Sequence, residues 1–253
     1  MKKAIYVILI IVLLGVFGYS AYLLGDYYLA KHQSDKCVSQ AAQHVHVRGK
    51  ADVSQTGDTG DPDDPEAPEP EGIDVDFEAL WKINGDIVAW IYCPGTPINY
   101  PIVQSDDNDY YLRRLLDGSY NIGGTLFLDF RCTDTFTGRN NIVYGHHMKS
   151  GTMFGSLVRY RNQSYYNEHP VMYLATPNGQ YRVVLFAGCT IDASNNIYTT
   201  NPTDDQILRM TRSSTFTPNY DLSLDDPILT LSTCAYDFEN ARYVLMGTLV
   251  PLE

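Results

Sequence analysis

Short β-rich apolar runs recur between residues 87 and 250 of this 253-residue chain and limit it to a small set of folds. The runs are rich in Ile, Val, Leu and aromatic residues and are bounded by Gly, Pro, Asn or Asp, which is typical of strands separated by turns. Many short strands, with helices only as insertions, predict a closed β-barrel or a β-sandwich. Eight runs have this pattern: 87–92, 98–103, 125–130, 141–144, 171–176, 181–189, 227–233 and 242–250.

Helices are predicted at only a few positions. The stretch 76–81 has the composition of a short capped helix, with an Asp at its start. Three further stretches, 107–116, 152–159 and 203–213, have apolar residues at helical spacing. All of them lie outside the predicted strands, so the core is expected to be mainly β.

The N-terminus predicts a membrane anchor. Lys2 and Lys3 precede 21 residues without a charge, 4–24, which is long enough to span a bilayer as a helix. A cleaved signal peptide, the competing interpretation, has a shorter apolar region and an A-x-A-like cleavage site. We therefore expect an uncleaved signal-anchor over residues 1–25. The two lysines would remain inside, and the rest of the chain would lie on the extracellular side of the cell membrane.

Residues 26–72 are predicted to be a polar juxtamembrane segment followed by an acidic, Pro-rich linker over 51–72. Eleven Asp or Glu and no Lys or Arg lie between Lys50 and Lys82, and they account for nearly all of the net charge of −12. A calcium site is less favoured than a solvated spacer that lifts the folded domain off the membrane, because calcium ligands need a folded loop. Without those eleven acids the rest of the chain, which includes most of the folded domain predicted at 73–253, has 19 acids and 18 bases, and this near-neutral balance argues against nucleic acid as a partner.

The cysteines do not indicate a metal site or a disulfide framework. An exported chain can form disulfides, but an odd count leaves at least one thiol free. No CxxC or Cys/His spacing is typical of zinc. We expect mostly buried, inert thiols, with one exception considered next; the five are Cys37, Cys93, Cys132, Cys189 and Cys234.

Three residues together could carry acyl-transfer chemistry. Cys234 ends a predicted strand beside a polar turn, although a thiol at such a position is more often a small buried hydrophobe. His146 follows a predicted strand and could exchange a proton near neutral pH, although a lone histidine is more often structural. Arg242 begins the last strand, where it is either a surface charge or a donor to an oxyanion.

These residues lie in motifs that resemble the sortases, the membrane-anchored cysteine transpeptidases of Gram-positive bacteria. The motifs are T-L-S-T-C at 230–234, Y-G-H at 144–146 and Arg242. The stretches at 100–104 and 124–129 resemble class B members in particular. The resemblance implies a closed eight-stranded β-barrel with N-terminal helices and a helix inserted before the penultimate strand, which the 203–213 pattern fits.

The resemblance also implies the site and the reaction. Cys234 would attack the carbonyl after threonine in a C-terminal sorting pentapeptide of a surface protein, of the N-P-x-T-x or L-P-x-T-x type. Arg242 would stabilise the oxyanion, His146 would protonate the leaving amine, and His147 would be non-catalytic. An amine of a peptidoglycan precursor or of a pilin lysine would resolve the thioester, with no cofactor or metal. The residues expected to line the peptide groove are Tyr144, Ser232 and Ile197.

Other histidine–cysteine enzymes arrange these residues differently. Papain-like enzymes have the nucleophile before the histidine, whereas His146 precedes Cys234 by 88 residues. Chymotrypsin-like cysteine proteases have the same order but a G-x-C-G context, and the L,D-transpeptidases have an H-G-C motif; the chain has neither. A cysteine protease with the His-then-Cys order and a membrane-tethered β-sandwich binding module with an inert Cys234 remain the alternatives.

Overall fold

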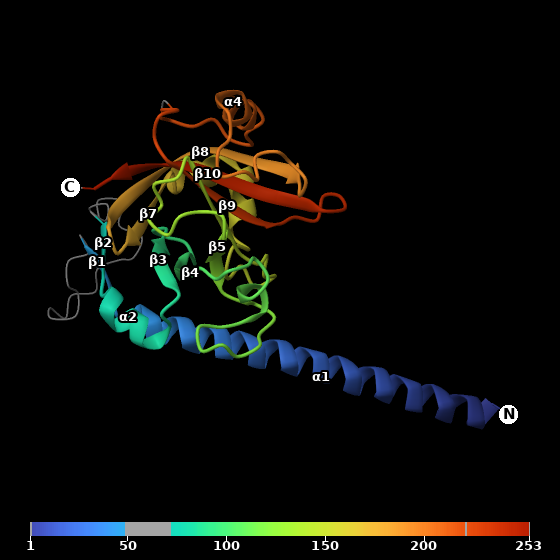
Figure 1. Cartoon of the computed structure of the whole chain (residues 1–253). Coiled ribbons are helices and arrows are strands. Elements are labelled where there is room, and N and C mark those ends of the chain that lie inside the picture. Colours follow the sequence, from blue (N-terminus) through green and yellow to red (C-terminus); the bar gives the residue numbers. More distant parts are fainter. Residues whose placement is uncertain (1, 49–71, 221, 253) are drawn as a thin grey trace, which may run out of the picture.

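The computed structural model describes residues 2–48, 72–220 and 222–252. Its main body is a barrel, and a long helix, α1 (Lys2–Ala42), runs along one side of the barrel and extends far beyond it (Figure 1). A two-stranded sheet of β1 (Val45–Arg48) and β2 (Gly72–Val75) and the short helix α2 (Phe77–Ile83) connect α1 to the first barrel strand. Asp76 caps α2 by accepting a hydrogen bond from the Ala79 N–H, which confirms the capped helix predicted there.

Eight strands close the barrel in the order β10-β8-β7-β3-β4-β5-β6-β9. The β4–β5 and β6–β9 pairs are parallel and the other pairs are antiparallel. This confirms the closed barrel and rules out the sandwich. Each strand overlaps one predicted run: β3 (Ile87–Tyr92), β4 (Asn99–Val103), β5 (Leu126–Leu128), β6 (Asn140–Tyr144), β7 (Val171–Thr176), β8 (Gly179–Asp192), β9 (Ile228–Cys234) and β10 (Ala241–Pro251).

The inserted helix before the penultimate strand is also confirmed. It is α4 (Asp204–Arg212), and its first turn is closed by a capping box between Thr203 and Gln206. Ile207 and Met210 on its buried face cover outward-pointing residues of β8, β9 and β10. The barrel interior is filled by the opposite set of strand residues, as the alternation of strand side chains requires.

Two other helix predictions were wrong. The 107–116 stretch forms only one 3₁₀ turn, η1 (Tyr111–Arg113), because the backbone becomes extended at Arg114, which pairs with Tyr120. In place of the helix predicted at 152–159 there is a 3₁₀ turn, η2 (Leu157–Arg161), followed by α3 (Gln163–Glu168). Met153, with φ +53°, is incompatible with a helix start at 152.

Helix α1 contacts the barrel well before the predicted domain start at residue 73. The Asn121 Nδ2 donates to the Ala30 carbonyl at 2.8 Å, and Ala41 is fully buried. The described residues include one candidate membrane span, within Leu9–Ala42, by length and composition. The candidate membrane span and the residues that contact the barrel thus belong to one continuous helix.

The acidic segment is flanked by the two strands of the small sheet, β1 and β2. Its residues 49–71 are outside the described residues, but the strands that flank it pair with each other, and Arg48 is the partner of Gly72. The two ends of the segment are therefore held together after α1 has already contacted the barrel. The spacer function expected of this segment stays a prediction, because its residues lie outside those that the structure describes.

Candidate active site

Cys234 is the last residue of β9, between β10 on one side and β6 on the other. Arg242 is its partner in the antiparallel β9–β10 ladder, and Ser232 is the partner of Tyr144 in the parallel β6–β9 ladder. Directly paired residues point to the same face of a sheet. Ser232 and Cys234, two apart on one strand, also share a face, so all four side chains lie on the outer face of the barrel wall.

His146 reaches the same end of the barrel through Gly145. The Gly145 N–H donates to the Ser232 carbonyl at 3.1 Å, which continues the β6–β9 pairing by one residue. His146 and Cys234 then each lie two residues beyond the Tyr144–Ser232 pair. A Cβ at Gly145 would overlap Leu126 and Phe154, so only glycine allows the chain to pass here. The glycine of the Y-G-H motif thus has a steric role.

The two histidines are held by different backbone carbonyls. The His146 Nε2 lies 2.7 Å from the Leu112 oxygen, and the His147 Nδ1 lies 2.7 Å from the Cys234 oxygen. Burial lowers the pKa of His146, although the contact with Leu112 opposes this shift. The His147 ring also packs against Tyr236, with 5.2 Å between ring centroids. Since its Nε2 is committed to Leu112, His146 has Nδ1 left for proton exchange.

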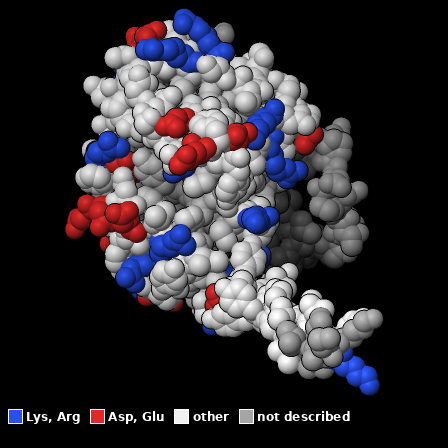
Figure 2. Space-filling view, turned by 90° about the vertical axis from the view of Figure 1, so that its right-hand side faces the viewer, with Lys and Arg blue, Asp and Glu red and all other residues white. Residues whose placement is uncertain are grey.

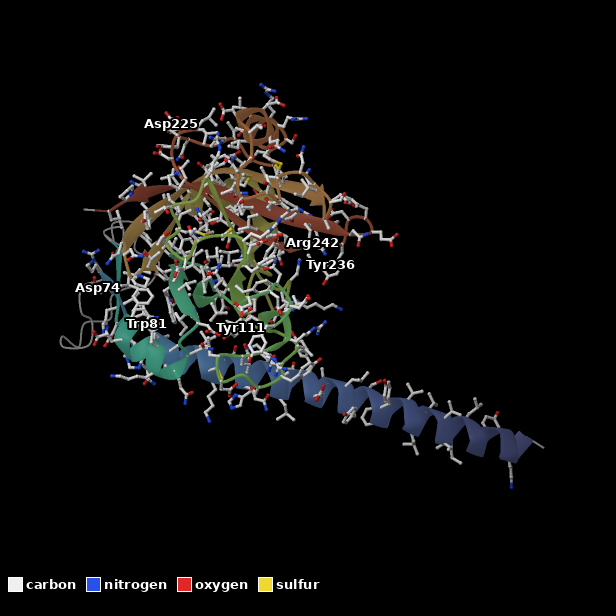
Figure 3. The ribbon with its side chains drawn as sticks, in the orientation of Figure 1. Asp74, Trp81, Tyr111, Asp225, Tyr236 and Arg242 are labelled. Carbon is white, nitrogen blue, oxygen red and sulfur yellow. The ribbon has the colours of Figure 1, made fainter. Side chains whose placement is uncertain are left out.

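Arg242 is available for an anionic partner. Among the residues that the structure describes, it forms no ion pair, and its Nη1 donates only to the Ala241 carbonyl at 3.0 Å. Figure 3 shows Arg242 and Tyr236 at the same end of the barrel, toward the side from which α1 extends. A guanidinium beside a thiol is the arrangement that stabilises the oxyanion of acyl transfer.

An aromatic pair lies beside these residues. The rings of Tyr144 and Tyr198 stack with centroids 6.2 Å apart, and the Tyr198 hydroxyl is 2.7 Å from the Ser232 Oγ. Burial raises the pKa of Tyr198. Ile197, expected in the peptide groove, is fully buried in the apolar cluster beneath α4. The half-buried Tyr198 is therefore the residue of this segment that contacts Ser232, and its adjacency to Ile197 was the only sequence signal for it.

Asn140 holds the backbone of this segment in place. The Asn140 Nδ2 donates to the carbonyls of Ile197 (3.1 Å) and Thr199 (2.8 Å), and its Oδ1 accepts from the Thr230 hydroxyl at 2.6 Å. Asn140 is almost completely buried. Because its partners are on distant segments, no local pattern could have singled it out.

A buried carboxylate, Asp129, contacts the aromatic pair directly and through Arg131. Asp129 has no exposed side-chain surface and binds the Arg131 guanidinium through both oxygens, at 2.8 and 2.7 Å. It also accepts from the Tyr144 hydroxyl at 3.0 Å, and Arg131 extends to the Tyr198 carbonyl at 3.4 Å. Burial alone would raise the pKa of Asp129, but the hydrogen bonds from Arg131 outweigh it and the pKa is lowered. This carboxylate thereby orients both tyrosines.

Two of the other cysteines are more deeply buried than Cys234. All five thiols are free, and Cys93 and Cys189 are buried. Burial raises the pKa of the Cys189 thiol to about 12, so it is not ionised near neutral pH. Among the described residues, no group of three or more His, Cys, Asp or Glu side chains could hold a metal ion.

The charges around this end of the barrel are mixed. Figure 2, viewed from the side on which Arg242 lies, shows Lys and Arg interspersed with Asp and Glu among many uncharged residues. A thiol, an imidazole and a guanidinium thus lie at one end of the barrel beside a pair of half-buried tyrosines. The arrangement suits acyl transfer on a peptide rather than binding of a polyanion.

Comparisons with known proteins agree with this chemistry. A family model of the sortase domain matches residues 91–250. Sortase B of Listeria monocytogenes is 32% identical over 252 residues, which cover 96% of this chain and 95% of that protein. The structure of a Staphylococcus aureus sortase B–substrate complex has a TM-score of 0.66 and 30% identity and covers 70% of this chain and 85% of the other. Sortase B of Bacillus anthracis in complex with AAEK1 has a TM-score of 0.68 and 29% identity, with 88% and 99% covered.

Proposed function

Since the chain belongs to the sortase family and its relatives are class B enzymes, we propose that Cys234, His146 and Arg242 carry out its transpeptidase reaction. Sortases are cysteine transpeptidases. The observation that carries the residue assignment is the shared strand register, which aligns Cys234 with Arg242 on one neighbour and with the residues leading to His146 on the other.

The proposed reaction has two halves. The Cys234 thiolate forms a bond to the carbonyl carbon after threonine, and Arg242 binds the resulting oxyanion. His146, as an imidazolium, donates its Nδ1 proton to the departing amine as the C–N bond breaks, leaving a thioester. An incoming amine then loses a proton to His146 and attacks the thioester, which forms a new amide and releases the Cys234 thiolate.

We propose that the substrate is a C-terminal sorting signal of the N-P-x-T-x or L-P-x-T-x type on a surface protein. Tyr144, Tyr198 and Ser232 would contact the peptide, since they lie on the same outer face as the nucleophile. Mixed surface charge around the site also fits a peptide without a strong net charge. The acceptor would be an amine of a peptidoglycan precursor or of a pilin lysine.

We propose that residues 1–25 anchor the protein once in the cell membrane, with the N-terminus inside and the catalytic domain on the extracellular side. The two lysines before the apolar stretch and the length of α1 support this topology. A cysteine-modifying reagent that cannot cross membranes should then react with Cys234 in intact cells.

Intact-mass measurement of an acyl-enzyme tests the function. The full chain in detergent is incubated with N-P-x-T-x and L-P-x-T-x peptides, with or without triglycine. We expect a thioester adduct that Cys234→Ala lacks and that Cys132→Ser, at a similarly half-buried thiol, retains. Product formation that triglycine does not alter would indicate a cysteine protease instead. An absence of adduct with every peptide would refute the assignment of Cys234.

A further inference from the structure

We propose that helix α1 positions the catalytic histidine through residues 111–125, named here the bridging loop. The inference rests on the proposed catalytic role of His146. It assigns Asn121 as a positioning residue and gives the anchor helix a part in catalysis besides tethering. The argument follows the contacts from His146 to the loop and from the loop to α1.

The inner side of the bridging loop binds His146. Its Leu112 carbonyl is the hydrogen-bond acceptor of the His146 Nε2, at 2.7 Å. Gly124, with φ +55°, brings the end of the loop against its beginning, and a Cβ there would lie 2.6 Å from the same Leu112 oxygen. The Thr125 N–H donates to the Tyr111 carbonyl at 3.1 Å. The loop is thus closed on itself around the carbonyl that orients the imidazole.

The outer side of the loop binds α1 through Asn121. This residue is 3% exposed, and its Nδ2 donates to the Ala30 carbonyl of α1 at 2.8 Å. Its Oδ1 accepts from the Gly123 N–H at 2.9 Å, and its own N–H donates to the Arg113 carbonyl at 2.9 Å. Asn121 therefore connects the helix directly to the residue next to Leu112.

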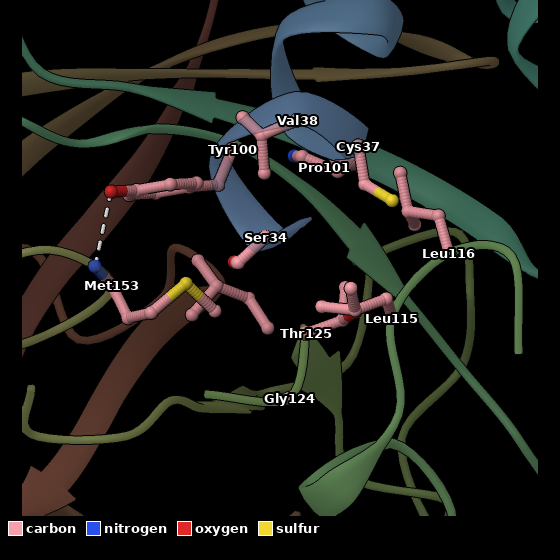
Figure 4. A pocket seen from close by; sticks show the side chains of 11 residues that line it. Ser34, Cys37, Val38, Tyr100, Pro101, Leu115, Leu116, Gly124, Thr125 and Met153 are labelled. Atoms are coloured by element: carbon pink, nitrogen blue, oxygen red, sulfur yellow. Dashed lines mark hydrogen bonds between the residues drawn. The ribbon is translucent and has the colours of Figure 1, made fainter. Parts of the chain in front are cut away.

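Side chains of α1 extend this contact. Ser34, Cys37 and Val38 face Leu115 and Thr125 across a small pocket between the helix and the loop (Figure 4). The Cys37 Sγ lies 3.9 Å from the Asp117 carboxylate, also on the loop. Val38 packs against the barrel core. The loop thus rests on several α1 residues, and the position of its Leu112 carbonyl depends on their contact.

A small movement of the loop would have a direct chemical effect. The Leu112 carbonyl selects which His146 nitrogen faces the substrate, and the loop helps to bury the ring. Catalytic groups need placement within about 0.5 Å, and an error near 1 Å costs about 100-fold in rate. Loosening α1 should therefore lower kcat more than it raises KM, because it disturbs proton transfer and not the peptide contacts.

Two variants of the full chain in detergent test this. Asn121→Asp keeps the oxygen that accepts from Gly123 but removes the donor to Ala30. Val38→Ala weakens the contact from the helix side without a change in charge. For both we expect kcat to fall about 10-fold, with KM within about two-fold of wild type. The matched control is Asn167→Asp, at an exposed site on α3, which should change neither kcat nor KM.

The titration of His146, followed by NMR of labelled histidine and assigned with His146→Gln, provides a second measurement. Burial is the main cause of its lowered pKa; the charge of Arg113 on the same loop adds to the shift, and the contact with the Leu112 carbonyl opposes it. Because burial is the largest of the three effects, a loosened loop should raise this pKa in both variants. Folded variants with wild-type kcat and wild-type titration would overturn the inference. A wild-type protein that forms no acyl-enzyme would instead refute the proposed function, which keeps the two outcomes distinct.

Discussion

Arg242 is the direct antiparallel partner of Cys234 in the β9–β10 ladder, so both side chains emerge on one face of the barrel wall. Their eight-residue separation in the sequence corresponds to a hairpin whose connection spans residues 235–240. The separation of the thiol from the guanidinium is therefore set by strand pairing and not by a flexible loop.

Arg242→Gln should lower kcat about 100- to 1,000-fold with little change in KM, because it removes the charge that stabilises the oxyanion. Arg242→Lys should recover only part of the rate, since an ammonium lacks the planar fork of donors. Steady-state cleavage of a sorting peptide in the presence of triglycine measures both. Arg182→Gln, on the exposed end of β8, is the control. A wild-type kcat in Arg242→Gln would show that another group binds the oxyanion.

His146 should make the protein less stable at acidic pH. Its pKa is lower in the folded state than the usual 6.5, because burial disfavours the charged ring. The unfolded chain therefore binds the proton more readily, and the free energy of unfolding falls as the pH drops below 6.5. In His146→Gln this contribution is absent. The free energy of unfolding should therefore change less between pH 7 and pH 5 in this variant than in wild type. Denaturant unfolding at each pH checks this, and parallel curves for the two proteins would contradict it.

Asn140→Ala should lower the free energy of unfolding by about 2–3 kcal/mol, because it removes the hydrogen bonds of a buried amide to the Thr230 hydroxyl and to the carbonyls of Ile197 and Thr199. KM for the sorting peptide should also rise, since the backbone on either side of Tyr198 loses its support. The free energy of unfolding is measured by denaturant titration, with the fluorescence of buried Trp90 as the signal. The control is Asn167→Ala, and an equal effect of both substitutions would argue against a specific anchor.

Tyr198→Phe should leave stability within about 1 kcal/mol, because the ring still stacks and one hydrogen bond to Ser232 is lost. Tyr198→Ala should lower kcat/KM for the sorting peptide by about 10-fold or more, because it removes an aromatic contact surface. Comparison of the two variants separates the contribution of the Tyr198 hydroxyl from that of its ring. If Tyr198→Ala cleaves the peptide as efficiently as wild type, Tyr198 does not contact the substrate.

Replacing residues 49–71 with a two-residue Asn-Gly turn should leave kcat/KM within about two-fold of wild type and stability within about 1 kcal/mol. Arg48 and Gly72 are already paired, and the entropy of closing a loop depends only weakly on its length. Fluorescence energy transfer from lipid to the barrel, in vesicles, should also be unchanged. A change in that transfer would mean that the segment does set the height of the barrel above the membrane.

Local patterns were sufficient for some parts of this protein. The eight strands follow from apolar runs bounded by turn residues, α2 follows from its N-terminal capping residue, and α4 follows from apolar residues at helical spacing. The helix predicted at 107–116 was wrong because the loop pairs Arg114 with Tyr120 and closes around Gly124, which overrides its apolar spacing. The supporting residues Asn121, Asp129 and Asn140 were missed, since each is a single polar residue whose partners are mostly remote in the chain.

By itself, the sequence determined the strand content, the apolar N-terminus and the residue types of a cysteine transpeptidase, because periodicity, charge and short motifs are local properties. Only the tertiary structure decided which residues share a face with Cys234, since one residue of register shift would turn every side chain of a strand to the opposite side. It also decided that Tyr198, rather than Ile197, is next to Ser232 and that α1 contacts the barrel before the acidic segment begins. Those relationships depend on contacts between distant segments, which form only when the barrel closes.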